Sequence, residues 1–169
     1  MSIKKIVTKS EKETKEFATQ FAAQILQKRG NKNAVVLALQ GDLGAGKTTF
    51  TQGFAQGLGI LEVVNSPTFV IMKKFQIPQG VVHKIRRPSD FVDGWFYHFD
   101  CYRLEHPEEI LQLGFKEIVS NPENIVVIEW PERIQKILPQ KIILIAFDHG
   151  AEHVRTLTAE HVRTLTIEQ

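Results

Sequence analysis

The sequence predicts a single three-layer α/β domain over residues 1–169, with a mainly parallel central sheet and helices on both faces. Three observations predict this fold. Strand-like and helix-like segments alternate along the chain. Residues 34–39 (AVVLAL) form a continuous apolar run, which is typical of a strand buried on both faces of a parallel sheet. The 169 residues, 43% of them apolar, are enough to bury one sizeable core.

The first predicted element is a helix that begins after Ser10. Ser10 and Glu13 have the spacing of a capping box, in which each side chain bonds a free backbone N–H at the helix start. Apolar side chains then recur at helical spacing, at Phe17, Phe21 and Ile25. Gly30 is expected to end the helix.

A glycine-rich turn over residues 41–46 follows the apolar run and leads into a second helix. This helix begins at Lys47 and is expected to end near Gly57 or Gly59. A strand, a tight turn and a helix in this order are the units of a parallel α/β sheet.

The remaining elements are shorter. A helix is expected from Pro107 to about Leu113, because proline favours the first helical turn and two glutamates follow it. Another short helix is expected after Pro131. Further strands are predicted around Val63 and Val64, after a turn within 66–75, and at 95–99, 125–128 and 141–147.

Residues 76–93 (QIPQGVVHKIRRPSDFVD) interrupt this pattern. The segment is long and polar, and we expect an inserted loop or hairpin outside the sheet. A charge run of this kind is usually a solvated face, and the alternatives are an RNA contact, a docking surface or a lid. The basic residues concerned are His83, Lys84, Arg86 and Arg87.

The C-terminal region contains an exact tandem duplication. The octapeptide AEHVRTLT at 151–158 is repeated at 159–166. Two short copies do not make a repeat architecture, and we interpret them as a neutral duplication. Because eight is an even number, a strand running through both copies would keep its two faces in register.

Composition points to an intracellular setting. The net charge of +2 does not single out a nucleic-acid-binding protein. The single cysteine, Cys101, excludes an internal disulfide and suits a reducing compartment. The N-terminal residues lack the apolar core of a signal peptide, and no apolar run reaches the roughly 18 residues of a membrane span. We therefore expect a cytoplasmic protein that does not associate with membranes.

Residues 41–48 (GDLGAGKT) match the phosphate-binding P-loop pattern G-x-x-x-x-G-K-[ST] and lie between a predicted strand and a helix start. Glycines let backbone N–H groups surround phosphate oxygens, and the helix start adds a positive dipole. Lys47 is expected to reach the β- and γ-phosphates of ATP, and the Thr48 hydroxyl to bind Mg²⁺. The predicted nucleotide-binding residues are Gly41, Asp42, Leu43, Gly44, Ala45, Gly46, Lys47, Thr48 and Thr49.

A P-loop also needs carboxylates for the metal and for the attacking water. Asp100 ends WFYHFD and Glu129 ends IVVIE, so each lies at the end of a predicted strand. In open α/β sheets these ends face the ligand crevice. Either residue could hold Mg²⁺ while the other positions water, and either could instead cap a turn.

Four motifs in this order resemble the TsaE (YjeE) family: GDLGAGKTTFTQG (41–53), NSPTF (65–69), HFDCYRL (98–104) and IEWPERI (128–134). The resemblance implies a P-loop NTPase-like fold and an ATPase required for threonylcarbamoyl modification of adenosine 37 in tRNA. It also implies action together with the proteins TsaB and TsaD.

The resemblance implies site roles as well. Glu129 and Asp100 would be the carboxylates that hold the metal and that assist hydrolysis. Lys47 and Thr48 would bind phosphate and Mg²⁺. Thr68 would lie in a switch-like loop near the γ-phosphate, although a plain Ser-Pro-Thr turn is the alternative. Trp130 would lie beside the nucleotide or pack at the edge of the core, and the adenine pocket would include Thr14.

Two further residues admit a structural interpretation. His98 is expected to orient Asp100 or a loop through a hydrogen bond, with proton transfer as the alternative. Arg103 is expected to form a structural salt bridge, or to pair with Asp100 or a phosphate.

Two other functions fit the same motifs. One is a binding module whose docking is switched by ATP and whose hydrolysis is incidental. The other is a small-molecule kinase with lid arginines. A GTPase is disfavoured, because no N-K-x-D motif follows the P-loop.

Overall fold

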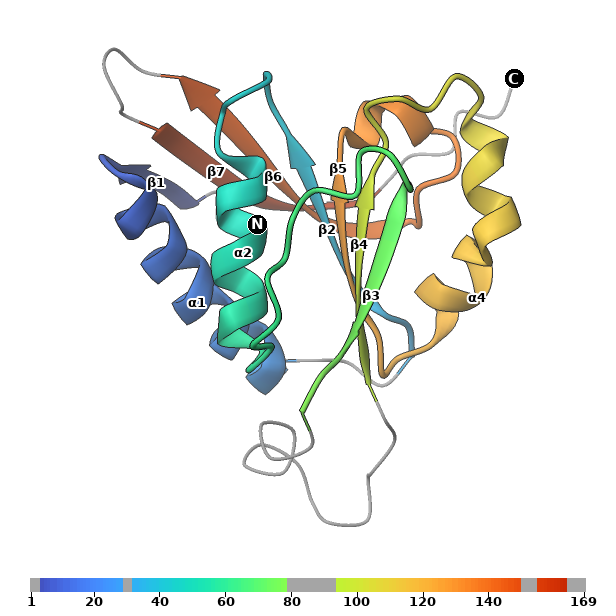
Figure 1. Ribbon diagram of the computed structural model, residues 1–169, viewed down its shortest axis with the longest axis horizontal. Helices are drawn as coiled ribbons and strands as arrows, with labels where there is room; N and C mark the ends of the chain where they lie inside the picture. The colour runs from blue at the N-terminus through green and yellow to red at the C-terminus, as the bar shows by residue number, and fades with distance from the viewer. Residues whose placement is uncertain (1–3, 29–31, 79–93, 150–154, 164–169) are drawn as a thin grey trace.

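The computed structural model describes residues 4–28, 32–78, 94–149 and 155–163, and places seven strands in one sheet (Figure 1). The strands are ordered β1-β7-β6-β2-β5-β4-β3 across the sheet. Their bounds are β1 (Lys4–Thr8), β2 (Val35–Gln40), β3 (Met72–Gln76), β4 (Trp95–Asp100), β5 (Ile125–Glu129), β6 (Lys141–His149) and β7 (Arg155–Arg163).

The centre of the sheet is parallel and its margins are antiparallel. Strands β6, β2, β5 and β4 run in the same direction, whereas β3, β7 and β1 pair antiparallel with their neighbours. The parallel centre confirms the prediction, and the antiparallel margins make the sheet mixed. The carboxyl ends of β2, β4 and β5 consequently meet at one edge.

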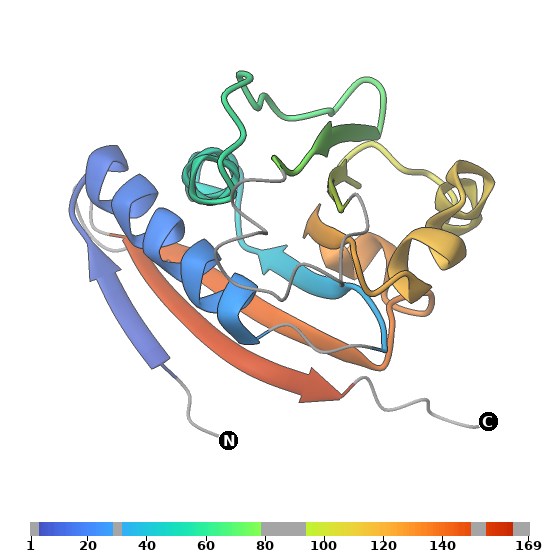
Figure 2. The same ribbon diagram turned by 90° about the horizontal axis from the view of Figure 1, so that it is seen from below.

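Helices cover both faces, which gives the three predicted layers (Figure 2). Helices α1 (Glu11–Lys28) and α2 (Lys47–Gly57) pack on the face that carries Leu37 and Leu39. The opposite face carries Val36 and Ala38. It is covered by the 3₁₀ helix η2 (Pro107–Leu113), the helix α4 (Phe115–Ser120) and the 3₁₀ helix η3 (Pro131–Ile134). Among the described residues, no helix is both long and apolar enough to cross a membrane.

Two glycines on α2 let it pack closely against α1. A Cβ atom built on Gly53 would lie 2.5 Å from the Lys15 carbonyl oxygen, and one on Gly57 would lie 2.6 Å from the Thr19 oxygen. The Thr19 hydroxyl donates to the Gly53 carbonyl at 2.9 Å, which is possible only at this short separation. The α1–α2 contact therefore fixes the second half of α2 against α1.

We expect Gly53→Ala to lower the free energy of unfolding by about 1–3 kcal/mol. The added methyl meets backbone atoms of α1 that cannot turn aside, and this cost outweighs the roughly 1 kcal/mol by which alanine favours a helix. Urea denaturation measures the change, with the exposed Gln56→Ala on the same helix as the matched control. A Gly53→Ala protein as stable as the wild type would contradict this account of the packing.

Several predicted elements need correction. Residues 63 and 64 form no strand, because only Val64 is buried and Val63 is 77% exposed in an irregular segment. The helix predicted from Pro107 is a 3₁₀ helix, and α4 after it was not predicted; Gly114, with φ of 74°, separates the two. Strand β1, a short strand at the edge of the described sheet that pairs with β7, was also not predicted.

The start of α1 follows the sequence closely. The Ser10 hydroxyl accepts the Glu13 N–H at 3.1 Å, as predicted. Glu13 differs in detail, because its carboxylate accepts the N–H of Lys9 at 2.7 Å. The predicted stop at Gly30 and most of the 76–93 insertion, including its basic residues, lie outside the described residues.

Strand β7 runs across the junction of the duplicated octapeptides. Its residues 155–158 come from the first copy and 159–163 from the second. The strand pairs with β6 over its whole length and with β1 over residues 155–159. One strand therefore runs through both copies. In the strand order, β6 separates it from β2, the strand that leads into the phosphate loop.

Candidate nucleotide-binding site

The loop between β2 and α2 has a backbone that requires glycine. Gly41 has φ of 145°, and a Cβ there would lie 2.6 Å from the Phe147 carbonyl oxygen. Gly44 and Gly46 have φ of 79° and 98°. Gly46 directly precedes α2, so the loop ends at a helix start whose first N–H groups have no partner within the helix. This is a ready anion site.

Lys47 folds back into this loop. Its Nζ donates to the Gly41 carbonyl at 2.5 Å and to the Asp42 carbonyl at 2.8 Å, and it lies 4.0 Å from the centre of the Trp130 ring. The residue is 4% exposed, and desolvation lowers the pKa of its ammonium below 10.5 although nearby carboxylates raise it. A dehydrated cation held by neutral carbonyls is suited to receive an anion.

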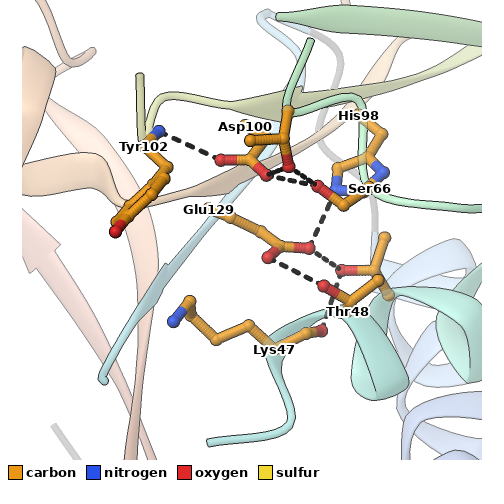
Figure 3. A network of polar contacts seen from close by, with 9 residues as sticks. Lys47, Thr48, Ser66, His98, Asp100, Tyr102 and Glu129 are labelled. Atoms are coloured by element: carbon orange, nitrogen blue, oxygen red, sulfur yellow. Dashed lines mark hydrogen bonds and ion pairs between the residues drawn. The ribbon is translucent and has the colours of Figure 1, made fainter. Parts of the chain in front are cut away.

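The two predicted carboxylates are neighbours. Asp100 and Glu129 are in register at the ends of β4 and β5, and Leu39 of β2 is in register with Glu129. Figure 3 shows the Glu129 carboxylate directed toward Thr48 at the start of α2, and the Asp100 carboxylate directed between Ser66 and the backbone N–H of Tyr102. Each is buried, at 4% and 3% exposure, and each is held by a separate set of hydrogen bonds.

Glu129 belongs to the P-loop side of the network. The Thr48 hydroxyl donates to its Oε2 at 3.1 Å. On its other oxygen, Oε1, His98 Nε2 lies at 2.9 Å and the Thr51 hydroxyl at 3.4 Å (Figure 3).

Asp100 belongs to the other side, where it holds the SPTF turn. Its Oδ2 accepts the hydroxyls of Ser66 and of Thr68, the latter at 2.6 Å. Its Oδ1 accepts the Tyr102 N–H at 3.0 Å. Cys101, beside it, points into the core, where burial raises the pKa of its thiol to about 12 and so disfavours the reactive thiolate.

These groups line one cleft of about 510 Å³ at the carboxyl edge of the sheet. It brings together the phosphate loop, both carboxylates, the SPTF turn and three aromatic side chains. Its lining residues are Glu11, Leu43, Gly44, Gly46, Lys47, Thr48, Thr49, Ser66, Thr68, Phe69, Asp100, Tyr102, Arg103, Glu129 and Trp130.

The donor set suits a magnesium ion that shares its ligands with phosphate. Thr48 and the two carboxylates offer hard oxygen atoms, which Mg²⁺ prefers. Among the described residues, no group of three or more His, Cys, Asp or Glu side chains could hold a metal by itself. A cation here would therefore need oxygen atoms from a bound ligand, as P-loop proteins usually supply from nucleotide.

Three predicted residues, Thr14, His98 and Arg103, find different partners from those expected, whereas Trp130 lies beside the phosphate loop and at the edge of the core as predicted. Thr14 is fully buried and bonds Thr8 and the Ser10 carbonyl, so it does not line the cleft, whereas Glu11 does. His98 contacts Glu129, not Asp100. The Arg103 guanidinium lies 4.2 Å from the Phe69 ring centre, and Trp130 packs partly on the core while covering Lys47.

Sequence reasoning missed three groups of this network. Ser66 lies two residues before Thr68, and its place before Pro67 was a usable signal for a hydroxyl in the turn. Thr51 lies one helical turn after Lys47, and this spacing puts it on the same helix face. Tyr102 contributes its backbone N–H, which leaves no signal in the sequence.

Comparisons with known proteins converge on one family. The family model "Threonylcarbamoyl adenosine biosynthesis protein TsaE" matches residues 8–157. A tRNA threonylcarbamoyladenosine biosynthesis protein TsaE from Haemophilus influenzae is 39% identical over 127 residues, which cover 75% of this chain and 71% of that protein. The Bacillus subtilis protein of the same name is 41% identical over 123 residues, covering 73% and 67%.

A solved structure agrees with these matches. The crystal structure of Bacillus subtilis YdiB superposes with a TM-score of 0.66 and 32% sequence identity, covering 95% of this chain and 86% of that one. The matched family residues include every motif that lines the cleft.

Proposed function

The chain belongs to the TsaE family of tRNA threonylcarbamoyladenosine biosynthesis proteins, and from this premise we propose that it is a magnesium-dependent ATPase. In this proposal it acts as an accessory subunit, with TsaB and TsaD, in the modification of adenosine 37 of tRNA. Contact with tRNA is indirect or weak, and the protein works in the cytoplasm.

One observation carries the ATPase proposal. Lys47 is almost fully buried, and its ammonium lies in a loop of glycines at a helix start. Such a cation is stabilised by an anion more than by carbonyl groups, because a charged acceptor compensates for the lost hydration. The triphosphate of ATP supplies that anion in P-loop proteins.

The two carboxylates divide the remaining work in this proposal. In this proposal Glu129 holds Mg²⁺, directly or through water; its hydrogen bond with Thr48, the P-loop residue expected to bind the metal, supports this choice over Asp100. Bound Mg²⁺ would neutralise charge on the phosphate oxygens. In this proposal Asp100 orients the SPTF turn and a water molecule that attacks the γ-phosphate, and its hydrogen bonds with the Ser66 and Thr68 hydroxyls support this role.

Hydrolysis by the isolated protein is expected to be slow. Phe69 is 83% exposed and Leu43 is 74% exposed, and both line the cleft. A cleft with an open, apolar rim admits water and weakens electrostatic stabilisation of the transition state. Docking of a partner over the rim would exclude that water and raise the rate of hydrolysis.

The proposal is tested by measuring phosphate release from ATP, with and without TsaB, TsaD and substrate tRNA. We expect slow release of inorganic phosphate by the chain alone and faster release in the complete mixture, together with repeated rounds of tRNA modification. Modification that proceeds at the same rate without this chain would contradict the accessory role.

The same assay separates the kinase alternative. A small-molecule kinase would transfer the phosphoryl group to an acceptor, so ADP formation would depend on added acceptor, and the product would be a phosphorylated acceptor and not inorganic phosphate. Inorganic phosphate released without any acceptor supports the ATPase.

A further inference from the structure

His98 is hydrogen-bonded to Glu129 but does not line the cleft. The proposed reaction has so far assigned it no role. His98 is fully buried in β4, two residues before Asp100. Alternation along a strand puts both side chains on the same face of the sheet, toward α2. Figure 3 shows the imidazole on the side of Glu129 away from Lys47.

The imidazole is the main donor to one oxygen of Glu129. Its Nε2 lies 2.9 Å from Oε1. The Thr51 hydroxyl also approaches Oε1, at 3.4 Å, but its single proton has a nearer acceptor in the Lys47 carbonyl at 3.0 Å. In a contact between an imidazole nitrogen and a carboxylate oxygen the ring N–H is the usual donor, which assigns the proton to Nε2.

The other ring nitrogen supports this tautomer. Nδ1 is buried and has no hydrogen-bond partner among the described residues. A buried N–H without an acceptor is rarer in proteins than a buried acceptor without a donor. The tautomer with an unprotonated Nδ1 and a protonated Nε2 therefore agrees with the hydrogen-bond partners of both ring nitrogens.

We propose that His98 is a positioning residue for Glu129: its Nε2–H holds Oε1, so that Oε2 stays directed at Thr48 and the phosphate loop. The proposal rests on the proposed function, in which Glu129 acts on the metal side of the nucleotide. A glutamate has several rotatable bonds, and a partner on one oxygen fixes the direction of the other. Groups that orient metal-side ligands in this way usually contribute about 10- to 100-fold to metal affinity or activity.

Two substitutions test it as a matched pair. The amide nitrogen of glutamine stands as many bonds from Cα as Nε2 of histidine does, whereas that of asparagine matches Nδ1. Both variants remove the ring, but only His98→Gln keeps a donor within reach of Oε1. We expect His98→Asn to lower kcat for ATP hydrolysis about 10- to 100-fold and His98→Gln to retain most of it.

The dissociation constant for nucleotide without Mg²⁺ should be unchanged in both variants, because the phosphate loop is intact. A purely structural role would lower the activity of both variants together, in step with their thermal unfolding. Equal loss of kcat in the two variants, or no loss in His98→Asn, would overturn the proposal.

A measurement on the wild-type protein covers the case in which neither variant folds. Long-range ¹H–¹⁵N correlation spectra report which ring nitrogen carries the proton. A protonated Nε2 for His98 supports the proposal, and a ring protonated at Nδ1 alone overturns it. This result is independent of the proposed function, which fails separately if the wild-type protein neither binds nor hydrolyses ATP.

Discussion

Replacing Lys47 by alanine should weaken ATP binding about 100-fold or more. The ammonium is 4% exposed and lies at the centre of the phosphate loop, so a bound phosphate would meet it with little competing water. Removing one partner of such a buried, charge-assisted contact costs roughly 3 kcal/mol, which corresponds to about two factors of ten in affinity.

Calorimetric titration with ATP and Mg²⁺ measures this loss, and circular dichroism checks that the fold is retained. Lys74→Ala is the matched control, because Lys74 lies on the edge strand β3 against Trp95, outside the cleft. We expect the control to bind ATP as the wild type does. Undiminished binding by Lys47→Ala would place the nucleotide elsewhere.

The affinity should also depend on pH in a specific direction. Desolvation lowers the pKa of Lys47 below 10.5, so this ammonium loses its proton at a lower pH than a surface lysine does. Since the charged form binds phosphate, affinity should fall as pH rises through the lowered pKa. Residual binding by Lys47→Ala should lack this alkaline decline.

The second large effect is expected from Glu129→Gln. The substitution keeps the shape of the side chain and removes its charge beside Thr48, where the proposal places Mg²⁺. We expect kcat for hydrolysis to fall by about 10²- to 10³-fold, the usual result of removing one electrostatic group from a preorganised site. Nucleotide should still bind, because the phosphate loop and Lys47 are unchanged.

Single-turnover hydrolysis measures the rate, and Glu117→Gln provides the control. Glu117 is exposed on α4 and does not line the cleft. The control should hydrolyse ATP at nearly the wild-type rate. A Glu129→Gln protein that supports repeated rounds of tRNA modification would favour the ATP-switched binding module, with hydrolysis incidental.

The parts of the fold that the sequence predicts well are those with a local cause. Examples are the glycines of the loop, the capping residue Ser10 and the apolar run of β2. Each determines the structure of residues close to it in the sequence. The ends of β4 and β5 could be placed as well, because Asp100 and Glu129 close apolar strands.

Long-range pairing limits what could be predicted. The partner of His98 depends on which strand lies beside β4, and only the register of β4 with β5 brings Glu129 within reach. Similarly, Thr14 lies in the first turn of α1 as expected, but β1 beside it provides Thr8 as a partner and turns Thr14 away from the cleft. Glu11, one turn earlier, lines the cleft instead.

The most direct test of the account is a calorimetric titration of the wild-type protein with ATP in the presence of Mg²⁺. The account predicts saturable binding of one nucleotide per chain, lost on replacement of Lys47. An absence of heat and of binding across millimolar ATP, in protein shown to be folded, would contradict the assignment of the cleft as a nucleotide site.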